Sequence, residues 1–339
     1  MTTTRHSALS KRIVIISALV ALTLAGGSGS HAQSRQALEV RHGRLLPLFE
    51  LAGVVFTDAD ETSGRIIVGV LDRDVEGLVR GQLARLGVSS ESVDIVETEP
   101  IARVATLRDK VRPIVAGLQI RFSQYVCSLG FNAALESTAG YVTASHCSTS
   151  QGTVDGTEYY QPLNRVPEEF IGTEVADPAF FRGGGCPRGR KCRYSDSNFS
   201  AGDSAVGFMM GAIARTTGPN NGSLEIVGEF SISGEGAALV GQTANKVGRT
   251  TGWTQGQVTR TCVNTGVSGS NIVLLCQDFV ENNRQIVAGG DSGSPVFRIN
   301  SSGRVTLLGN LWGGNSSGTL FVYSPIANIE RELGPLTTF

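Results

Sequence analysis

The chain has few histidines and almost no net charge, and each shortage excludes a class of function. Its 339 residues contain four histidines; His6, His31 and His42 lie near the N-terminus, and only His146 comes later. The formal net charge is −1, so no long-range field attracts a phosphate backbone or an anionic lipid surface. We therefore expect no nucleic-acid partner and no stable membrane association.

Long apolar runs are absent after the N-terminal segment. Residues 1–32 begin with basic side chains that include Lys11 and Arg12, continue with an apolar run over 13–25, and end in small residues. This order is typical of a secretory signal peptide. A membrane anchor is the competing interpretation, but a spanning helix needs about 20 apolar residues. We expect cleavage near Ala32 and a secreted, extracellular or periplasmic protein.

No Cys-x-x-Cys pair occurs, and only one histidine lies near the cysteines, so neither a zinc site nor another metal or cofactor is expected. All six cysteines follow the signal segment, and export would expose them to oxidising conditions. Many pairings are possible in principle. Their order along the chain favours three local disulfides: Cys127 with Cys147, Cys186 with Cys192, and Cys262 with Cys276.

Glycine, in contrast, is abundant at 43 residues, and many tight turns are typical of all-β folds. From residue 114 onward, short apolar runs such as 140–144, 272–276 and 304–308 alternate with turn residues. This pattern predicts a β-sandwich or β-barrel. Only 326–333 places its apolar residues at helical spacing, which predicts a terminal helix.

The region between the signal segment and the first cysteine has a different pattern. Residues 54–57 and 65–71 have strand character, 74–86 has helical spacing, and 93–96 returns to strand alternation. This β-β-α-β order predicts a small α+β unit. Such a unit is consistent with either a pro-region or a minor domain.

The join between this unit and the β-rich region is expected between Thr106 and Gly117. Three basic residues there, Arg108, Lys110 and Arg112, offer cleavage points. The predicted domains are therefore a signal peptide at 1–32, a pro-region or small α+β domain at 33–113, and a β domain at 114–339.

The segment Gly289-Gly290-Asp291-Ser292-Gly293-Ser294-Pro295 carries the clearest chemical signal. A serine hydroxyl becomes a nucleophile when a base lies within hydrogen-bond reach. No histidine follows Ser292, so His146 is the base that the sequence offers. The neighbouring glycines would let the backbone N–H groups of Gly290 and Ser292 point at one place, as an oxyanion hole requires.

A third member must be a carboxylate that orients the histidine. The main candidates between His146 and Ser292 are Asp155, Asp177, Asp196 and Asp203. We favour Asp196, because a disulfide just before it would hold its strand rigidly. Asp177 comes next, although an aspartate before a proline is more often a turn residue.

The order histidine, aspartate, serine excludes the α/β-hydrolase arrangement, in which the nucleophile comes first. Together with this order, segments 127–131, 140–147, 247–253 and 290–295 resemble the chymotrypsin-like serine peptidases of the S1 family. The resemblance is to the secreted bacterial branch that includes the streptogrisins and alpha-lytic protease. It covers somewhat more than half of the chain.

The resemblance implies an all-β fold of two six-stranded antiparallel β-barrels with a C-terminal helix. His146 and Asp196 would lie on the first barrel and Ser292 on the second. The activity implied is peptide hydrolysis through an acyl-enzyme, by a monomer without a cofactor. In this branch a pro-region assists folding, which residues 33–113 would provide. An arginine matching Arg249 would pair with Asp291 and order the oxyanion loop.

The substrate pocket departs from the family pattern. Ile286 stands six residues before Ser292, where a trypsin-like enzyme has an aspartate. The pocket edge Trp312-Gly313-Gly314 lacks the serine expected before the glycines, and no cysteine follows Cys276. We expect no preference for lysine or arginine, but an apolar or small residue before the cut. Two alternatives remain: a catalytically silent binding module, or a latent zymogen until the N-terminal region is removed.

Overall fold

The computed structural model describes residues 27–101 and 104–339, and it divides the chain into two compact units, Met1–Arg103 and Val104–Phe339. The predicted signal peptide lies outside the described residues except for 27–32, whose backbone begins helix α1 (Gly27–Gly43). The predicted cleavage point near Ala32 therefore falls within this helix. None of the described helices combines the length and apolarity needed to cross a membrane.

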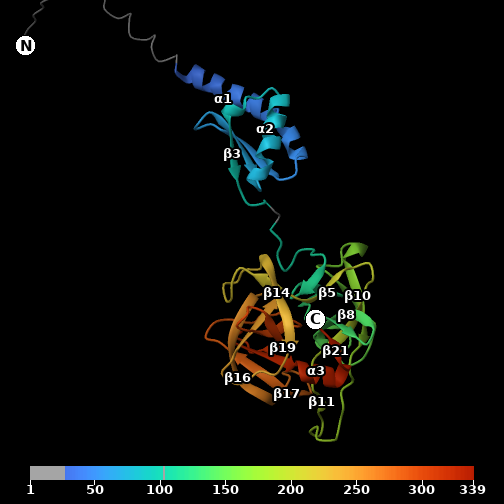
Figure 1. The fold of residues 1–339 in the computed structure, drawn as a ribbon. Helices are drawn as coiled ribbons and strands as arrows, with labels where there is room; N and C mark the ends of the chain where they lie inside the picture. The colour runs from blue at the N-terminus through green and yellow to red at the C-terminus, as the bar shows by residue number, and fades with distance from the viewer. Residues whose placement is uncertain (1–26, 102–103) are drawn as a thin grey trace, which may run out of the picture. The chain divides into compact units, whose positions relative to one another are not determined.

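The first unit contains a three-stranded sheet with the order β1-β2-β3 (Figure 1). β1 and β2 are antiparallel, and β2 and β3 are parallel with α2 in the crossover, as a parallel connection requires. The strands and helix match the predicted β-β-α-β order: β1 (Val54–Asp60), β2 (Arg65–Val70), α2 (Glu76–Arg85) and β3 (Val93–Glu97).

This unit has its own apolar core. Val79 and Leu83 of α2 pack with Ile66 and Val68 of β2, and all four side chains are fully buried. Helix α1, which the sequence did not predict, contributes Leu38 to the same cluster. The helical spacing read over residues 74–86 therefore reports a buried face.

The second unit begins with a closed antiparallel barrel. Its strands pair in the order β7-β8-β12-β10-β9-β5-β6, and β6 continues into β7 across two residues, so the two act as one bent strand. Counted in this way, six strands form a ring. They are β5 (Gln119–Phe122), β6 (Tyr125–Ser128), β7 (Phe131–Leu135), β8 (Thr138–Thr143), β9 (Glu158–Tyr160), β10 (Phe170–Ala176) and β12 (Asn198–Gly202).

A second antiparallel barrel follows. Its strands pair in the closed order β15-β16-β17-β20-β19-β18 and back to β15. The strands are β15 (Thr243–Gly248), β16 (Gly252–Gly266), β17 (Ile272–Glu281), β18 (Pro295–Ile299), β19 (Val305–Gly314) and β20 (Leu320–Pro325). The predicted double six-stranded barrel is therefore confirmed.

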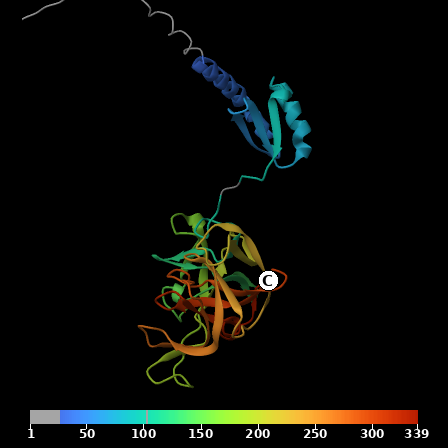
Figure 2. The ribbon, with the colours of Figure 1, turned by 90° about the vertical axis from the view of Figure 1, so that its left-hand side faces the viewer.

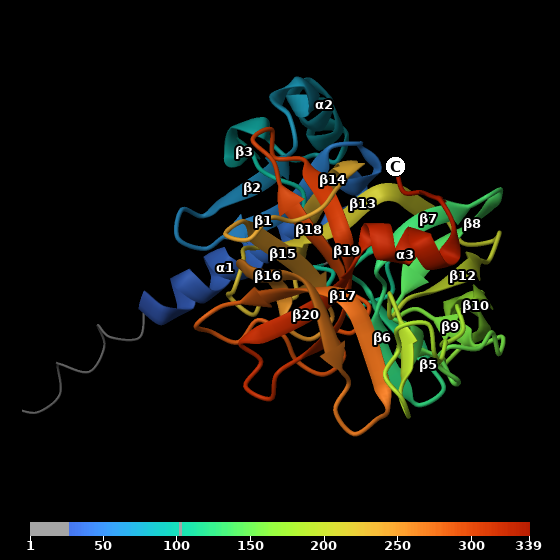
Figure 3. The same ribbon diagram turned by 90° about the horizontal axis from the view of Figure 1, so that it is seen from below.

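Further strands join the two barrels. The hairpin of β13 (Phe208–Thr216) and β14 (Ile226–Glu235) pairs in parallel with β19 and with β4 (Ile114–Ala116). After the second barrel, α3 (Ile326–Leu333) covers the predicted helical segment and lies beside β19 (Figure 3). Strand β21 (Leu336–Thr337) then pairs with β7, so the C-terminus returns to the first barrel.

The second unit starts before the expected boundary at 113/114. Leu107 is fully buried in the main core of this unit. Its backbone N–H donates to Leu224 O at 2.9 Å, and its carbonyl accepts from Gln119 N at 2.7 Å. Ile226 N also donates to Ala105 O at 2.8 Å. The chain is thus bonded to the barrels from Ala105 onward.

All three predicted disulfides are present. Cys127–Cys147 joins β6 to the turn that carries His146, and Cys262–Cys276 links β16 to β17. Cys186–Cys192 closes a loop that leads into the short strand β11 (Lys191–Arg193). Each bridge therefore fixes a segment that borders the region described next.

Candidate active site

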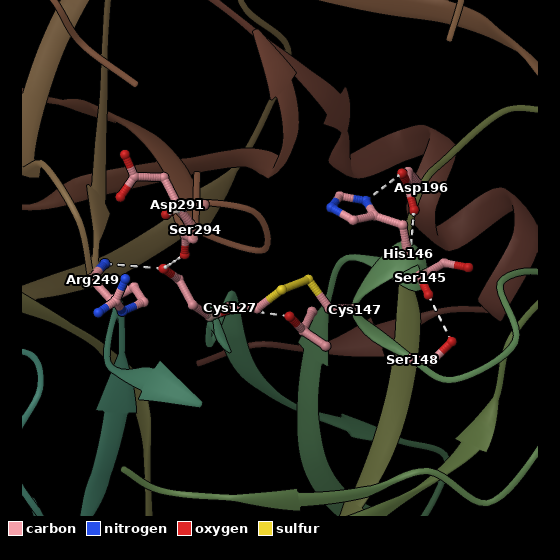
Figure 4. Close-up of a disulfide and its surroundings, with 12 residues drawn as sticks. Cys127, Ser145, His146, Cys147, Ser148, Asp196, Arg249, Asp291 and Ser294 are labelled. Atoms are coloured by element: carbon pink, nitrogen blue, oxygen red, sulfur yellow. Dashed lines mark hydrogen bonds and ion pairs between the residues drawn. A yellow bond between two sulfur atoms is a disulfide. The ribbon is translucent and has the colours of Figure 1, made fainter. Parts of the chain in front are cut away.

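His146 and Asp196 contact each other at one edge of the first barrel (Figure 4). His146 lies in a 3₁₀ turn directly after β8, and Asp196 lies in the loop between β11 and β12. Asp196 Oδ2 is 2.8 Å from His146 Nδ1, and Asp196 Oδ1 accepts the backbone N–H of His146 at 2.9 Å. The carboxylate thus fixes the ring and the backbone of the same residue, which leaves Nε2 free for another partner.

The other candidate aspartates have different roles. Asp177 accepts from Ser145 Oγ and Gly152 N, Asp155 accepts from Thr157 N, and Asp203 accepts from Ala205 N. Asp196 is therefore the aspartate that the structure brings to the imidazole of His146.

The two pKa values are shifted in opposite directions. Desolvation lowers the pKa of His146, but the charge of Asp196 and the hydrogen bond to it raise this pKa more, so it lies above its usual value. Burial raises the pKa of Asp196, but the charge of His146 and the hydrogen bond between the two residues lower it, and the charge of Arg193 lowers it as well. Together these interactions outweigh burial, so the pKa of Asp196 lies below its usual value. Both shifts favour an aspartate that stays ionised beside a basic imidazole.

A network of buried polar side chains holds the Asp196 loop in place. The fully buried guanidinium of Arg193 donates to Asp177 Oδ1 at 2.7 Å and to Ser197 O at 2.7 Å. Glu332 of α3 accepts from Tyr194 N at 2.7 Å and from Ser195 N at 2.9 Å. The C-terminal helix therefore helps to position the aspartate.

Ser292 lies in the tight loop between β17 and β18. Gly290 and Gly293 have φ of +94° and +89°, a region that favours glycine. A Cβ at Gly293 would lie 2.1 Å from Ser128 O, so no larger residue fits there. Backbone conformation and close packing therefore require small residues on both sides of the serine.

The backbone of this loop presents two free donors. Among the described residues, neither the N–H of Gly290 nor that of Ser292 has a hydrogen-bond acceptor. Ser128, at the end of β6, fixes the loop through two hydrogen bonds. Its Oγ donates to Gly290 O at 2.9 Å, and its N–H donates to Ser292 O at 2.8 Å. The arrangement can donate two hydrogen bonds to an oxygen placed beside Ser292.

The predicted pair of Arg249 with Asp291 is wrong. Arg249 makes no ion pair within the described ranges; its Nε donates to Gln119 Oε1 at 2.7 Å. The partner of Asp291 is Lys246 on β15, whose Nζ lies 3.2 Å from Asp291 Oδ2, and both side chains are fully buried. Lys246 points into the protein beside this loop, whereas the Arg249 side chain has turned towards the first barrel.

Further donors complete the surroundings of the buried carboxylate. Asp291 accepts from Thr250 N at 2.9 Å, Thr251 Oγ1 at 2.7 Å and Ala288 N at 3.0 Å. Burial lowers the pKa of Lys246 below its usual value, although the charge of Asp291 acts in the opposite direction. Asp291 thus ties the Ser292 loop to β15 through one ion pair and several hydrogen bonds.

Two adjoining cavities border the site. The larger, about 540 Å³, is lined by His146, Asp196, Trp312 and the turn residues 265–268. The smaller, about 160 Å³, is lined by Ser292, Leu311 and the segment 287–289. The two share Gly313, Gly314 and Asn315 at the end of β19. His146 and Ser292 therefore line two neighbouring cavities, together termed the cleft, and no direct hydrogen bond joins the two residues within the described part of the chain.

Of the predicted pocket residues, three line the cleft and one does not. Gly313 and Gly314 line both cavities, and Trp312 lines the larger one, where its Nε1 donates to Gln277 Oε1 at 2.9 Å. Ile286 is fully buried in the core of the second barrel, so its assignment to the pocket was wrong. Its N–H bonds to Gly318 O at 2.7 Å, which turns the next residue, Val287, to the cavity.

Three further residues contact the site although no sequence motif predicts them: Lys246, Glu332 and Ser128. A lysine within the strand-like run Ala244-Asn245-Lys246-Val247 is a signal for Lys246, because a charged residue in such a run needs a buried partner. Ser128 follows Cys127 but carries no pattern of its own. Glu332 is a polar residue of the amphipathic segment 326–333, and no neighbouring residue in the sequence distinguishes it from a solvent-exposed charge.

The double barrel, the His146–Asp196 pair and the serine loop of the second barrel together resemble the arrangement of chymotrypsin-like serine peptidases. No protein-family model matches the chain, and no curated protein matches it. Solved structures of bacterial chymotrypsin-like serine proteases are similar to it.

Three of these structures illustrate the similarity. Thermobifida fusca protease A has 22% identity over 67% of this chain and 99% of its own, with a TM-score of 0.46. Nocardiopsis protease has 22% identity over 66% of this chain and 97% of its own, with a TM-score of 0.48. Cellulomonas bogoriensis chymotrypsin has 20% identity over 67% of this chain and 98% of its own, with a TM-score of 0.48.

Proposed function

We propose that this protein is a secreted serine endopeptidase that cleaves peptide bonds through an acyl-enzyme. The observation that carries the proposal is the 2.8 Å contact between Asp196 Oδ2 and His146 Nδ1, at a cleft that also contains Ser292. Secretion is supported by the three disulfides and by the signal-like segment at 1–32.

Each residue has one task in the proposed reaction. Ser292 Oγ attacks the scissile carbonyl while His146 Nε2 takes the proton from this hydroxyl. His146 then gives the proton to the leaving amine. Asp196 keeps the Nδ1 proton in place and stabilises the imidazolium. The N–H groups of Gly290 and Ser292 stabilise the oxyanion, and loss of one such donor typically costs about 3 kcal/mol in the barrier. Water then releases the acyl group by the same steps.

The smaller cavity supports a preference for small or apolar side chains before the cut. Val287, Ala288 and Leu311 line it, and no charged side chain does. Its volume of about 160 Å³ is near that of apolar cavities that accommodate a benzene-sized group, about 150 Å³. A lysine or arginine would bury its charge there without a partner, which is strongly unfavourable.

The decisive experiment is replacement of Ser292 by alanine in the protein as it is secreted and matured. We expect loss of both peptide hydrolysis and labelling by a fluorophosphonate probe, with the fold retained by circular dichroism. Thr250→Ala, which changes a hydroxyl beside the loop, is the matched control and should still be labelled. Unchanged labelling of Ser292→Ala would refute the assignment. A folded wild-type protein that is labelled neither before nor after removal of the N-terminal region would instead indicate a silent binding module.

We propose in addition that residues 33 to about 103 form a pro-region and that the chain is latent until this region is removed. The division of the chain into two compact units supports this proposal. Intact mass and probe labelling of the same secreted sample test it. Labelling of the uncleaved species would refute latency without affecting the assignment of Ser292.

A further inference from the structure

The loop that leads into β11 carries a concentration of positive charge. Residues 182–191, termed here the basic loop, contain Arg182, Arg188, Arg190 and Lys191. No acidic residue occurs anywhere between Asp177 and Asp196. The three arginines are exposed. A run of four cations without a neighbouring anion repels itself, so some other feature must hold it together.

Among residues 27–101 and 104–339, these cations have no acidic partner. Within the described part of the chain, none of the four forms an ion pair; Arg182 Nη1 donates to Arg190 O at 3.3 Å, and Lys191 Nζ lies 4.0 Å from the centre of the Phe180 ring. The Cys186–Cys192 disulfide closes the loop and keeps the charges together. The molecule as a whole carries a net charge of −1, so this concentration is local.

The basic loop borders the cleft through the β16–β17 hairpin. Its end, β11, lies beside β17 and pairs with it in parallel (Figures 1 and 2). Arg190 Nη1 donates to Ser270 O at 3.1 Å. Ser270 N in turn donates to Val267 O at 3.2 Å, and Val267 lines the larger cavity beside His146. Two successive hydrogen bonds through the β16–β17 turn therefore connect the basic loop to a residue that lines the cavity.

This side of the cleft would receive the residues that precede the scissile bond. If the smaller cavity holds the side chain directly before the cut, the preceding residues pass along Gly313–Asn315, which both cavities share, into the larger one. They then reach the turn residues 265–268 and, beyond them, the basic loop. A substrate with acidic residues a few positions before the cut would bring its carboxylates to these arginines.

We propose that the basic loop is a substrate-binding site for acidic polypeptide segments on the N-terminal side of the scissile bond. The proposal rests on the proposed peptidase function and adds a substrate class to it. The small cavity selects the residue at the cut by shape, and the basic loop selects the preceding segment by charge. Attraction between exposed charges is screened by salt, so this selection weakens as ionic strength rises.

Matched peptides test the proposal. A fluorogenic peptide that the enzyme cleaves is prepared with Asp-Asp-Glu or Asn-Asn-Gln at the third to fifth positions before the cut. At low salt we expect kcat/KM for the acidic peptide to exceed that for the neutral one by about fivefold to tenfold, from two or more exposed charge pairs. The ratio should approach one at 1 M salt, where screening acts over about 3 Å.

Variants assign the effect to the loop. Arg182→Gln with Arg188→Gln should abolish the preference while leaving hydrolysis of the neutral peptide and fluorophosphonate labelling unchanged. Arg215→Gln with Arg304→Gln, which removes the same charge from exposed positions elsewhere, should retain it. Arg182→Glu with Arg188→Glu should favour a lysine-containing peptide. Equal cleavage of both peptides by the wild type, or an equal loss in the control variant, overturns the proposal.

Discussion

At the scale of single residues, the conformation of the Ser292 loop depends on one buried ion pair. Lys246 and Asp291 are both fully buried, and such a pair is costly to form because two charges leave water. The surrounding donors, among them Thr250 N and Thr251 Oγ1, reduce this cost by completing the coordination of the carboxylate. The pair therefore acts mainly to fix the loop in one position, and removal of one partner leaves the other charge unpaired.

Replacement of Lys246 tests this dependence. Lys246→Met should destabilise the second unit by about 3–5 kcal/mol, because Asp291 would remain buried without a counter-charge. Labelling of Ser292 by a fluorophosphonate should fall with it. Arg249→Gln is the control and should cost little, because Arg249 does not pair with Asp291. If thermal unfolding showed Arg249→Gln to be the more damaging change, the assignment of Lys246 would be wrong.

The raised pKa of His146 predicts the pH dependence of the proposed reaction. The base must be neutral, so the rate falls as the pH drops through this pKa, which lies above the usual 6.5. Asp196→Asn removes the charge that raises the pKa and should move the midpoint to lower pH, with a loss of about 10,000-fold in rate. The rate of fluorophosphonate labelling against pH measures both effects. An unchanged midpoint in Asp196→Asn would argue against the contact.

Among the elements, α3 has a role that its position in the sequence conceals. Its apolar side chains Ile326 and Ile329 are buried in the main core. Its carboxylate Glu332 accepts from Tyr194 N, Ser195 N and Ser195 Oγ, directly before Asp196. A short helix more than 120 residues further along the chain thus holds the loop that orients the histidine.

Glu332→Ala should lower kcat more than it changes KM, because it loosens Asp196 rather than the cleft. A loss of about tenfold to 100-fold is expected from imprecise positioning. Glu330→Ala is a matched control on the same helix, since its Oε1 accepts from Leu336 N and not from the Asp196 loop. A purely structural role for Glu332 would instead lower the melting temperature without altering kcat of the folded enzyme.

Strand β10 contains a buried acid that makes stability depend on pH. Burial raises the pKa of Glu174 from 4.5 to about 7, with Asp177 and Asp155 contributing their negative charge. The folded state therefore binds more protons than the unfolded state between about pH 4.5 and 7, and stability falls as pH rises through this window. Glu174→Gln should remove this fall and raise the melting temperature at pH 8 by a few degrees. The melting temperatures of wild type and Glu174→Gln are measured from pH 4 to pH 8. If the two melting temperatures changed with pH in the same way, the prediction would be wrong.

For the whole molecule, local patterns predicted the fold well and long-range contacts poorly. Turn residues and strand alternation indicated the barrels, helical spacing over 326–333 indicated α3, and cysteine order gave the three disulfides. Lys246 and Glu332 could not be assigned, because their partners lie far away in the sequence. Ile286 was misplaced because a shift of one residue in a tight loop exchanges a buried side chain for one that lines the cavity.

The boundary of the second unit predicts where maturation occurs. Ala105, Thr106 and Leu107 bond to β14 and its approach, and Arg108 Nε donates to Arg249 O at 2.9 Å. Cleavage after Arg108 would therefore cut a segment packed on the barrels. We expect cleavage between Glu97 and Ala105, which N-terminal sequencing of the secreted enzyme can determine. A mature chain that began after Arg108, Lys110 or Arg112 would contradict this expectation.

The pairing of β21 with β7 has a consequence for synthesis. Leu336 and Thr337 are translated after every strand of the two barrels, and α3 with Glu332 only just before them. Neither the last strand of the first sheet nor the support for the Asp196 loop can form until the segment that follows β20 has left the ribosome. A nascent chain in which both barrels have emerged but α3 has not would therefore lack the contacts that position Asp196 beside His146.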